Sequence, residues 1–201
     1  MALILPPTGI DEAAACIRAG QIVAIPTDTV YGLAADPFQP AAVERLFRLK
    51  GRPENKPILL LVDSLGQVER LTSRRPQALD RLAARFWPGP LTLILPAAAF
   101  VPERITAGTG TVAVRMPGSL LTRRLIRAAR APLTGTSANR SGRPAARSAR
   151  EVWEQFAGER LLVLDGGPAP SEIPSTIVDL TGEPRIVREG AVPGEAVLCL
   201  T

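Results

Sequence analysis

Residues 21–33 have the sequence QIVAIPTDTVYGL, an apolar run followed by a loop rich in hydroxyl groups. The apolar part, 21–26, has the length and flanking residues expected of a strand buried in a sheet. In α/β proteins, loops that follow the carboxyl ends of strands are where ligands bind. Thr27, Thr29 and Tyr31 alternate, so their side chains share one side if the loop stays extended. A polar loop capped by its own Thr and Asp side chains explains these residues equally well.

Helix and strand patterns alternate along the rest of the chain. A helix is expected from Thr8, with Asp11 at the capping-box position, to Gly20. Further helices are expected at 40–49, 76–87, 118–130 and 148–157. Further strands are expected at 58–62, 91–95, 111–116, 132–137, 161–165, 175–180, 184–189 and 196–200. This alternation predicts an α/β fold, and the hairpin-rich C-terminal third predicts that its sheet is mixed.

The composition excludes several classes of mechanism. The chain has 201 residues, no histidine and two cysteines, Cys16 and Cys199. A histidine general base, a Ser-His-Asp triad and a histidine metal site are therefore impossible. Two cysteines near opposite ends of the chain are too few for a zinc cluster. The length predicts one domain, spanning 1–201.

Positive charge is concentrated in one section of the sequence. Residues 104–150 contain ten arginines and no acid, so the rest of the chain carries 14 cations and 19 anions. Unpaired cations repel one another, and a polyanion such as tRNA or double-stranded RNA would relieve this repulsion. A solvated helix face is the usual explanation of a charge run, but the missing acids count against it.

No segment of the sequence has the length of a membrane span. The longest apolar runs, such as 58–62, are strand-sized. The first residues, MALILPP, lack a basic segment and are too short for a signal peptide. We therefore expect a cytoplasmic protein without a membrane partner.

The two lysines of the chain, Lys50 and Lys56, both lie in KGRPENKP, residues 50–57. With Arg52 they form a positively charged loop that two prolines stiffen, as preorganised phosphate binding requires. The other 22 cations are arginines, so lysine here suggests a need for a compact ammonium group. A favourable charge at a helix end explains Lys50 alone.

Two further segments offer side chains that can hold a ligand. TSANRSG, residues 136–142, is a donor-rich turn suited to a phosphate or ribose, although an ordinary Asx or Ser turn is a more common explanation. Arg115 lies in the otherwise apolar segment 111–117, and a buried arginine usually pairs with a carboxylate. That carboxylate can belong to the protein or to a ligand, and because no acid lies near Arg115 in the sequence, we favour a ligand. GTGTVA, 108–113, leads into a strand and not a helix, which excludes a dinucleotide fingerprint.

Together these motifs resemble the YrdC/Sua5 family of L-threonylcarbamoyladenylate synthases. They occur in order as PTDTVYGL (26–33), KGRP (50–53), WPGPLT (87–92), TVAVRMP (111–117), TSANRSG (136–142), PSTIVD (174–179) and VREG (187–190). Lys50-x-Arg52 and Ser137-x-Asn139 are similar to the family's signature. The resemblance implies a single-domain α/β fold, with a twisted mixed sheet, flanking helices and a positively charged concave face.

The resemblance also implies an activity. The family condenses L-threonine, bicarbonate or CO2, and ATP to threonylcarbamoyl-AMP and pyrophosphate, as a nucleotidyltransferase. A downstream transferase complex passes the threonylcarbamoyl group to adenosine 37 of tRNA. This chemistry needs no histidine if the enzyme acts by positioning and charge stabilisation. Mg²⁺ on the phosphates is expected, and no carboxylate cluster identifies its ligands.

The family's site residues are carried over to the matching positions of this chain. Lys50 and Arg52 are expected to be catalytic. The resemblance assigns ATP to Lys50, Arg52, Lys56, Thr111, Ser137, Asn139 and Arg188. It assigns L-threonine to Thr29, Arg115 and Ser175. Thr27, Tyr31 and Thr176 match motif positions without an assigned role.

The sequence departs from the family pattern at a few positions. Lys56 stands where Asn is common, Leu61 where His is common, and Pro174 where Glu is common. None of these changes removes a cation or amide from the signature, so we expect activity. The alternative is a non-catalytic RNA-binding paralogue, which would have no need of the three threonine-binding residues.

Overall fold

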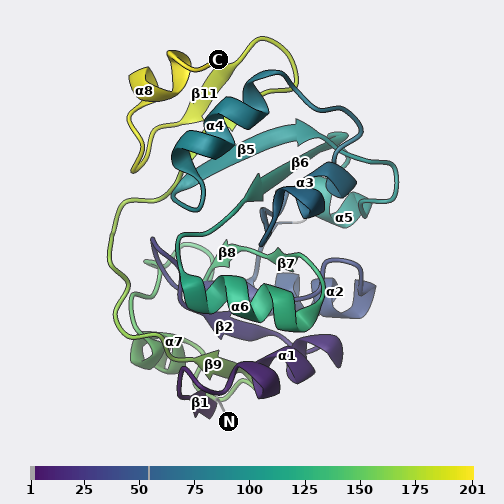
Figure 1. Ribbon diagram of the computed structural model, residues 1–201. Helices are drawn as coiled ribbons and strands as arrows, with labels where there is room; N and C mark the ends of the chain where they lie inside the picture. The colour runs from purple at the N-terminus through teal and green to yellow at the C-terminus, as the bar shows by residue number, and fades with distance from the viewer. Residues whose placement is uncertain (1–2, 54) are drawn as a thin grey trace.

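The computed structural model describes residues 3–53 and 55–201, and its α/β architecture confirms the fold class expected from the sequence (Figure 1). Strand directions are mixed, as predicted. Hydrogen bonding divides the described strands into two sheets, whereas a single sheet was expected. The sheet containing the N-terminal strands lies in the lower half of Figure 1, and the other lies in the upper half.

The first sheet has the strand order β1-β9-β2-β3-β8. Its strands are Leu3–Leu5 (β1), Leu162–Leu164 (β9), Val23–Ile25 (β2), Gly32–Ala34 (β3) and Thr136–Ser137 (β8). β1, β9 and β2 are parallel, whereas β3 is antiparallel to β2 and to β8. The hydroxyl-rich residues 26–31 are therefore the short connection from β2 to β3.

The second sheet has the order β11-β10-β5-β6-β4-β7. Its strands are Arg185–Arg188 (β11), Thr176–Asp179 (β10), Leu91–Pro96 (β5), Thr111–Arg115 (β6), Leu60–Leu61 (β4) and Leu133–Thr134 (β7). β5 runs antiparallel to β6 and parallel to β10. This register brings the end of β6, the start of β5 and the start of β10 to one edge of the sheet.

The helices of the described residues are Ile10–Arg18 (α1), Pro40–Lys50 (α2), Leu65–Leu71 (α3), Ala78–Phe86 (α4), Glu103–Thr106 (α5), Leu120–Ala129 (α6), Ala149–Gln155 (α7) and Gly194–Leu198 (α8). Helix α2 buries Val43, Leu46 and Phe47, the residues whose spacing predicted it. It ends at Gly51, whose φ of 59° is the left-handed conformation typical of a helix C-terminus. In the described part of the chain, no helix is long and apolar enough to cross a membrane.

Three local predictions differ from the structure. The apolar residues 196–200, expected to be a strand, belong mostly to α8, where Val197 alone of Val197–Leu200 is fully buried. The first helix starts at Ile10 after Gly9, and neither Thr8 nor another side chain caps it. Strand β3 begins at Gly32, inside the segment 26–33 that sequence alone assigned to a loop. In segments as short as these, tertiary contacts outweigh local preference.

The strand expected at 132–137 explains why there are two sheets. It is broken at Gly135, so that β7 pairs with β4 of one sheet and β8 pairs with β3 of the other. A Cβ atom at Gly135 would lie 2.7 Å from Cγ of Leu61, which is too close for any side chain. Only glycine therefore allows the chain to cross at this point, and the two sheets meet there.

Candidate active site

A small cavity of about 40 Å³ lies where the two sheets meet. It is lined from both sides by hydroxyl groups, one guanidinium and apolar side chains, contributed by Thr27, Thr29, Val30, Tyr31, Gly32, Leu59, Leu61, Arg115, Gly135, Thr136 and Ser137. Thr29 and Arg115 were predicted to bind threonine, and Ser137 was predicted to bind ATP. The fold thus brings members of the two predicted sets to one cavity.

The connection from β2 to β3 forms a chain of hydroxyl hydrogen bonds. Thr27 Oγ1 donates to the carbonyl oxygen of Val30 at 2.7 Å and accepts the backbone N–H of Thr29. The bond to Val30 uses the only hydroxyl proton of Thr27. Thr29 Oγ1 is therefore the donor in the 3.0 Å hydrogen bond between the two hydroxyls. Thr29 Oγ1 in turn accepts a hydrogen bond from Arg115 Nη1 at 3.2 Å. The direction of each hydrogen bond therefore follows from that of its neighbour.

The guanidinium of Arg115 is 4% exposed and is held on several sides. Besides its contact with Thr29, its Nε donates to the carbonyl oxygen of Gly89 at 3.0 Å. The N–H of Gly89 donates to Met116, so the turn after α4 is bound to the end of β6 by two hydrogen bonds. A Cβ at Gly89 would lie 2.4 Å from the carbonyl oxygen of Phe86, so this turn requires glycine.

A carboxylate of the protein itself faces Arg115, whereas we expected a ligand to supply it in preference to the protein. Oδ1 of Asp28 lies 2.6 Å from Arg115 Nη2. No aligned hydrogen bond joins them, because neither atom has a hydrogen-bond partner among the described residues. The contact is therefore an ion pair. The prediction failed because 87 residues separate the partners in sequence, whereas the fold places them side by side.

Ser175 is the third residue that was predicted to bind L-threonine. It lies just before β10, at the sheet edge that also holds the end of β6. Arg188 Nη2 donates to its carbonyl oxygen at 2.7 Å and to its hydroxyl at 3.2 Å. Arg188 belongs to the exposed strand β11, yet its guanidinium is partly covered. This partial burial, followed by the positive charge of Arg115, lowers the pKa of Arg188. Arg188, predicted to bind ATP, thus contacts Ser175, predicted to bind L-threonine.

Lys50 is the centre of the predicted phosphate site, and it is almost fully buried, with an exposure of 3%. Its ammonium donates to the carbonyl oxygen of Ser137, to that of Asn139 at 2.9 Å and to Asn139 Oδ1 at 3.1 Å. The Ser137 hydroxyl also donates to Asn139 Oδ1, at 2.6 Å. All three N–H groups of Lys50 are therefore used to join the two signature segments.

No carboxylate faces Lys50 among these contacts. Burial, and secondarily the positive charge of Arg52, lowers the pKa of Lys50 to about 8. The three acceptor oxygens act in the opposite direction, because they favour the charged ammonium. Among the described residues, no acid in contact with Lys50 compensates its positive charge, which an anion such as a phosphate would stabilise.

Arg52 lies in the loop that follows α2. Its Nη2 donates to the carbonyl oxygen of Pro57 at 2.7 Å, which folds the loop back on itself. Its Nε is buried without a hydrogen-bond partner in the described part of the chain, and burial lowers the pKa of Arg52. Lys56 is exposed in the same loop, and no hydrogen bond or ion pair of its side chain occurs within 3–53 and 55–201. A hydrogen bond thus holds the side chain of Arg52 in place, whereas no described contact holds that of Lys56.

Thr111 lies apart from the other predicted residues. It is the first residue of β6, whereas Arg115 is the last, and four residues of a strand span about 13 Å. Its hydroxyl lies 2.8 Å from that of Thr109. The described contacts do not connect it with Lys50 or Arg115, and its assignment to ATP stays a prediction.

Two residues that matched the motifs without a role are structural. Tyr31 is fully buried, and its hydroxyl donates to the carbonyl oxygen of Gly167 at 2.7 Å. Burial raises the pKa of Tyr31 to about 12, so the hydroxyl stays protonated. Thr176 Oγ1 exchanges hydrogen bonds with the backbone of Val192, which fixes the segment after β11.

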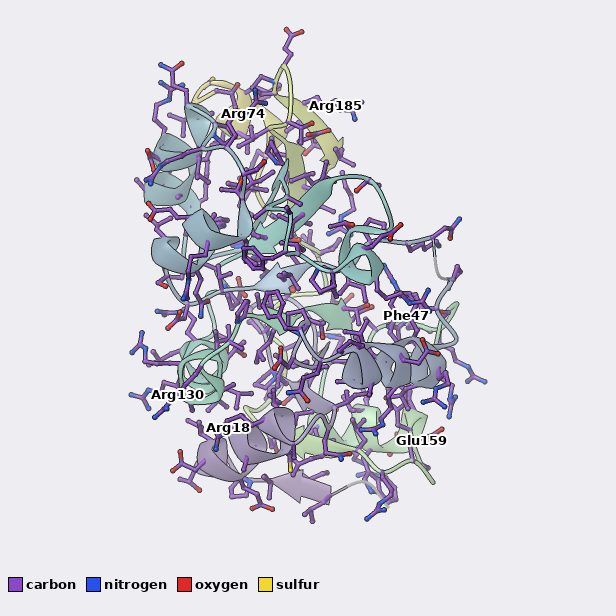
Figure 2. The ribbon with its side chains drawn as sticks, turned by 90° about the vertical axis from the view of Figure 1, so that its right-hand side faces the viewer. Arg18, Phe47, Arg74, Arg130, Glu159 and Arg185 are labelled. Carbon is purple, nitrogen blue, oxygen red and sulfur yellow. The ribbon has the colours of Figure 1, made fainter. Side chains whose placement is uncertain are left out.

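The arginine-rich section 104–150 is less unbalanced than its sequence suggests. Six of its ten arginines pair with acids from outside the section: Arg104–Glu44, Arg115–Asp28, Arg127–Asp63, Arg140–Glu159, Arg147–Glu172 and Arg150–Glu154. Figure 2 also shows Arg18, Arg74, Arg130 and Arg185 spread over both ends of the molecule. The expectation that the arginines of 104–150 lack acidic partners is therefore wrong for these six, because acids outside the section pair with them.

Within residues 3–53 and 55–201, no three His, Cys, Asp or Glu side chains lie close enough together to hold a metal ion. The described residues therefore do not form a protein cage for Mg²⁺. A magnesium ion that arrives on ATP needs no such cage, since it is held mainly by phosphate oxygens and water.

Comparison with known proteins decides the family. The Sua5/YciO/YrdC family model, described as telomere recombination, matches residues 15–190. The chain belongs to the Sua5/YciO/YrdC family. The resemblance predicted from the sequence motifs is thereby confirmed.

Several curated relatives in this family are similar over most of the chain. The threonylcarbamoyl-AMP synthase of Pyrococcus abyssi is 44% identical over 186 residues, which are 92% of this chain and 55% of the relative. That of Bacillus subtilis is 39% identical over 94% of this chain and 55% of the relative. That of Pseudomonas putida is 40% identical over 90% of this chain and 97% of the relative. The chain thus spans about half of the first two relatives and nearly all of the third.

Solved structures of the Sua5/YciO/YrdC family have the same fold. P. abyssi Sua5 complexed with L-threonine has a TM-score of 0.94 and 40% identity, covering 100% of this chain and 60% of that one. Escherichia coli YciO has a TM-score of 0.84 and 25% identity, covering 96% of this chain and 97% of that one. The likeness to both confirms the YrdC-like fold.

Proposed function

We propose that this chain is an L-threonylcarbamoyladenylate synthase, a transferase that acts as a nucleotidyltransferase. The observation that carries the proposal is the cavity where the sheets meet, which joins Thr29 and Arg115 to Ser137. Curated relatives named threonylcarbamoyl-AMP synthase and the threonine complex of P. abyssi Sua5 support it. We further propose cytoplasmic action, with the product consumed by a transferase complex that modifies tRNA.

The proposed reaction has two bond-forming steps. The amine nitrogen of L-threonine attacks the carbon of CO2, or of bicarbonate with loss of water, and gives up a proton as the carbamate forms. A carbamate oxygen then attacks the α-phosphorus of ATP, and the bond from that phosphorus to the bridging oxygen breaks. Pyrophosphate leaves, and threonylcarbamoyl-AMP remains. The first step needs the amine and the one-carbon unit to be positioned, and the second brings an anionic carbamate to the phosphates, so positioning and fixed positive charge are the main requirements.

The threonine end of the site is built to orient a carboxylate. The guanidinium of Arg115 can form paired hydrogen bonds to the substrate carboxylate. Thr29 fixes one terminal nitrogen of that guanidinium, and Gly89 fixes Nε. Ser175, held by Arg188, lies at the same edge of the sheet and offers a hydroxyl. In this arrangement the threonine amine would face the site of carboxylation.

The nucleotide end supplies positive charge for the phosphates. Lys50 holds the Ser137–Asn139 turn in place, and its charge is uncompensated by any acid in its contacts. Arg52 and Arg188 add guanidinium groups near the two ends of the site. Their charges would stabilise the negative charge that develops as pyrophosphate leaves. Magnesium would enter as part of the ATP substrate.

The decisive experiment measures pyrophosphate release from ATP with L-threonine and bicarbonate, using the full chain. We expect release that requires both co-substrates, together with a product having the mass of threonylcarbamoyl-AMP. An Arg147→Ala variant, altered at an exposed ion pair, serves as the control and should retain the rate. ATP turnover that ignores threonine would sink the proposal, as would the absence of any turnover by a folded protein.

A further inference from the structure

The ion pair between Asp28 and Arg115 is unusual in its hydrogen bonding. Both carboxylate oxygens of Asp28 are buried, and neither has a hydrogen-bond partner among the described residues. Nη2 of Arg115, 2.6 Å from one of them, also lacks a hydrogen-bond partner in the part of the chain that the structure describes. A buried carboxylate without hydrogen bonds is destabilising unless a nearby charge compensates it. Its retention here requires an explanation.

Several N–H groups of Arg115 have no aligned acceptor among the described residues. A guanidinium has five N–H groups. Nε uses its own for Gly89, and Nη1 uses one of its two for Thr29. Asp28 attracts Nη2 by charge but is not aligned to accept its protons. One N–H of Nη1 and both of Nη2 therefore have no aligned acceptor among the described residues, Nη2 being buried beside Asp28, and a bidentate carboxylate uses two such N–H groups.

A second cation makes the charge of Asp28 important. Arg188 lies close enough to Arg115 for the two positive charges to influence each other, as the lowered pKa of Arg188 indicates. Two guanidinium groups at a partly buried site repel each other. The negative charge of Asp28 offsets this repulsion and favours the position of Arg115 beside Thr29.

Backbone packing holds the carboxylate in place. A Cβ atom at Gly118 would lie 3.0 Å from Asp28 Oδ2 and 3.1 Å from its Cγ, so the bare backbone of Gly118 covers the carboxylate. No φ in the left-handed range requires glycine at this position. Close contact with Asp28 thus explains the glycine at this position.

We propose that Asp28 is a positioning residue for L-threonine: it fixes the guanidinium of Arg115 by charge while leaving its N–H groups to the substrate carboxylate. This inference rests on the proposed function. It predicts that Asp28 affects the binding of a carboxylate far more than the chemical step, because it touches neither the substrate nor the reacting atoms. It also predicts little effect on ATP.

The test compares Asp28→Asn with wild type in the full chain. Removal of the charge should raise the Kd for L-threonine, measured by calorimetry, and its KM by about tenfold to a hundredfold. The kcat and the KM for ATP should stay within about threefold, as expected when only ground-state binding is lost. L-Threoninol, which lacks the carboxylate, should bind wild type and variant equally. Asp28→Glu, which restores the charge, should recover part of the threonine affinity.

Asp63→Asn is the matched control, because Asp63 also pairs with an arginine, Arg127, and is 11% exposed. It should leave threonine affinity unchanged. Equal threonine affinity in Asp28→Asn and wild type would overturn the inference and leave the proposed function standing. A folded wild type that binds no threonine would overturn both. If Asp28→Asn does not fold, Gly118→Ala displaces the same carboxylate while keeping its charge, and an unchanged threonine Kd would again refute the proposal.

Discussion

The two ends of the candidate site hold their cations in opposite ways. At the threonine end, Arg115 is paired with a buried acid of the protein, Asp28. At the nucleotide end, Lys50 is equally buried, but its contacts are two carbonyl oxygens and one amide oxygen. Arg115 is paired with a negative charge, whereas Lys50 has no acid among its contacts with the described residues.

The difference matches the charges of the two proposed substrates. An amino acid brings one carboxylate, which a single oriented guanidinium can bind without a large local field. ATP brings several negative charges, which need positive potential that the protein has not already neutralised. The uncompensated charge is also visible in the lowered pKa of Lys50, whose causes are burial and Arg52. The comparison can be tested at both ends.

The largest effect is expected from Lys50→Met. The change removes the positive charge and the three hydrogen bonds that hold the Ser137–Asn139 turn. We expect kcat/KM for ATP to fall by about 10²- to 10³-fold, the usual loss for a preorganised group that stabilises developing charge. Pyrophosphate release measures the rate, and circular dichroism checks that the fold persists. A rate near that of wild type would remove Lys50 from the phosphate site.

Loss of Arg115 should affect stability as well as binding. Arg115→Met leaves Asp28 buried without its counter-charge, and such a change lowers the free energy of unfolding by about 3 kcal/mol or more. The double variant with Asp28→Asn should recover at least half of that loss. Urea unfolding of wild type, both single variants and the double variant forms a complete cycle. Additive effects would show that the two side chains do not interact.

The pH dependence should differ between the two ends. As pH rises through about 8, Lys50 loses its charge, so kcat/KM for ATP should fall about tenfold between pH 8 and 9.5. The affinity for threonine should not follow the titration of Lys50, because the hydrogen bonds of Lys50 go to Ser137 and Asn139 and not to Thr29, Arg115 or Ser175. Equal profiles for both substrates would contradict the contrast between the two ends.

The same lysine contributes to stability with a defined sign. In the unfolded chain it keeps its proton up to about pH 10.5, whereas in the folded protein it releases it near pH 8. The unfolded state therefore binds more protons in this interval. The contribution of Lys50 to the free energy of unfolding should rise with pH from about 8 to 10.5, which urea unfolding at fixed pH values can measure.

The smallest effect is expected at the surface. Arg147→Ala removes an arginine whose side chain is 49% exposed and whose partner is Glu172. Exposed ion pairs contribute little, so kcat/KM for both substrates should stay within about twofold of wild type. A large loss of activity would show that the section 104–150 acts as a whole, contrary to its dispersed ion pairs.

Most helices and long strands could be predicted because their apolar residues repeat with the period of the element. The helix α2 and the strands β5 and β6 are examples. The chain crossing at Gly135 could not be predicted, because it depends on Leu61, which is 74 residues away. The helix α8 was missed because five apolar residues have no distinct period in so short a segment.

For the site, the sequence identified residue types suited to phosphate and carboxylate, and the motif order indicated the family. It missed Asp28, although this is the single acid in PTDTVYGL, because its partner lies in another sheet. It also overestimated the free positive charge of section 104–150. Charge balance depends on distance in space, which a count along the chain does not contain.

By itself, the sequence determined the α/β class, the absence of histidine chemistry and the set of cations that a phosphate site would use. These depend on composition, periodicity and local motifs. Only the tertiary structure decided that Lys50 joins Ser137 to Asn139, that Arg115 has Asp28 beside it, and that both lie where two sheets meet. The reason is physical: burial, ion pairing and hydrogen-bond direction are properties of contacts between distant segments, and those contacts exist only once the chain has folded.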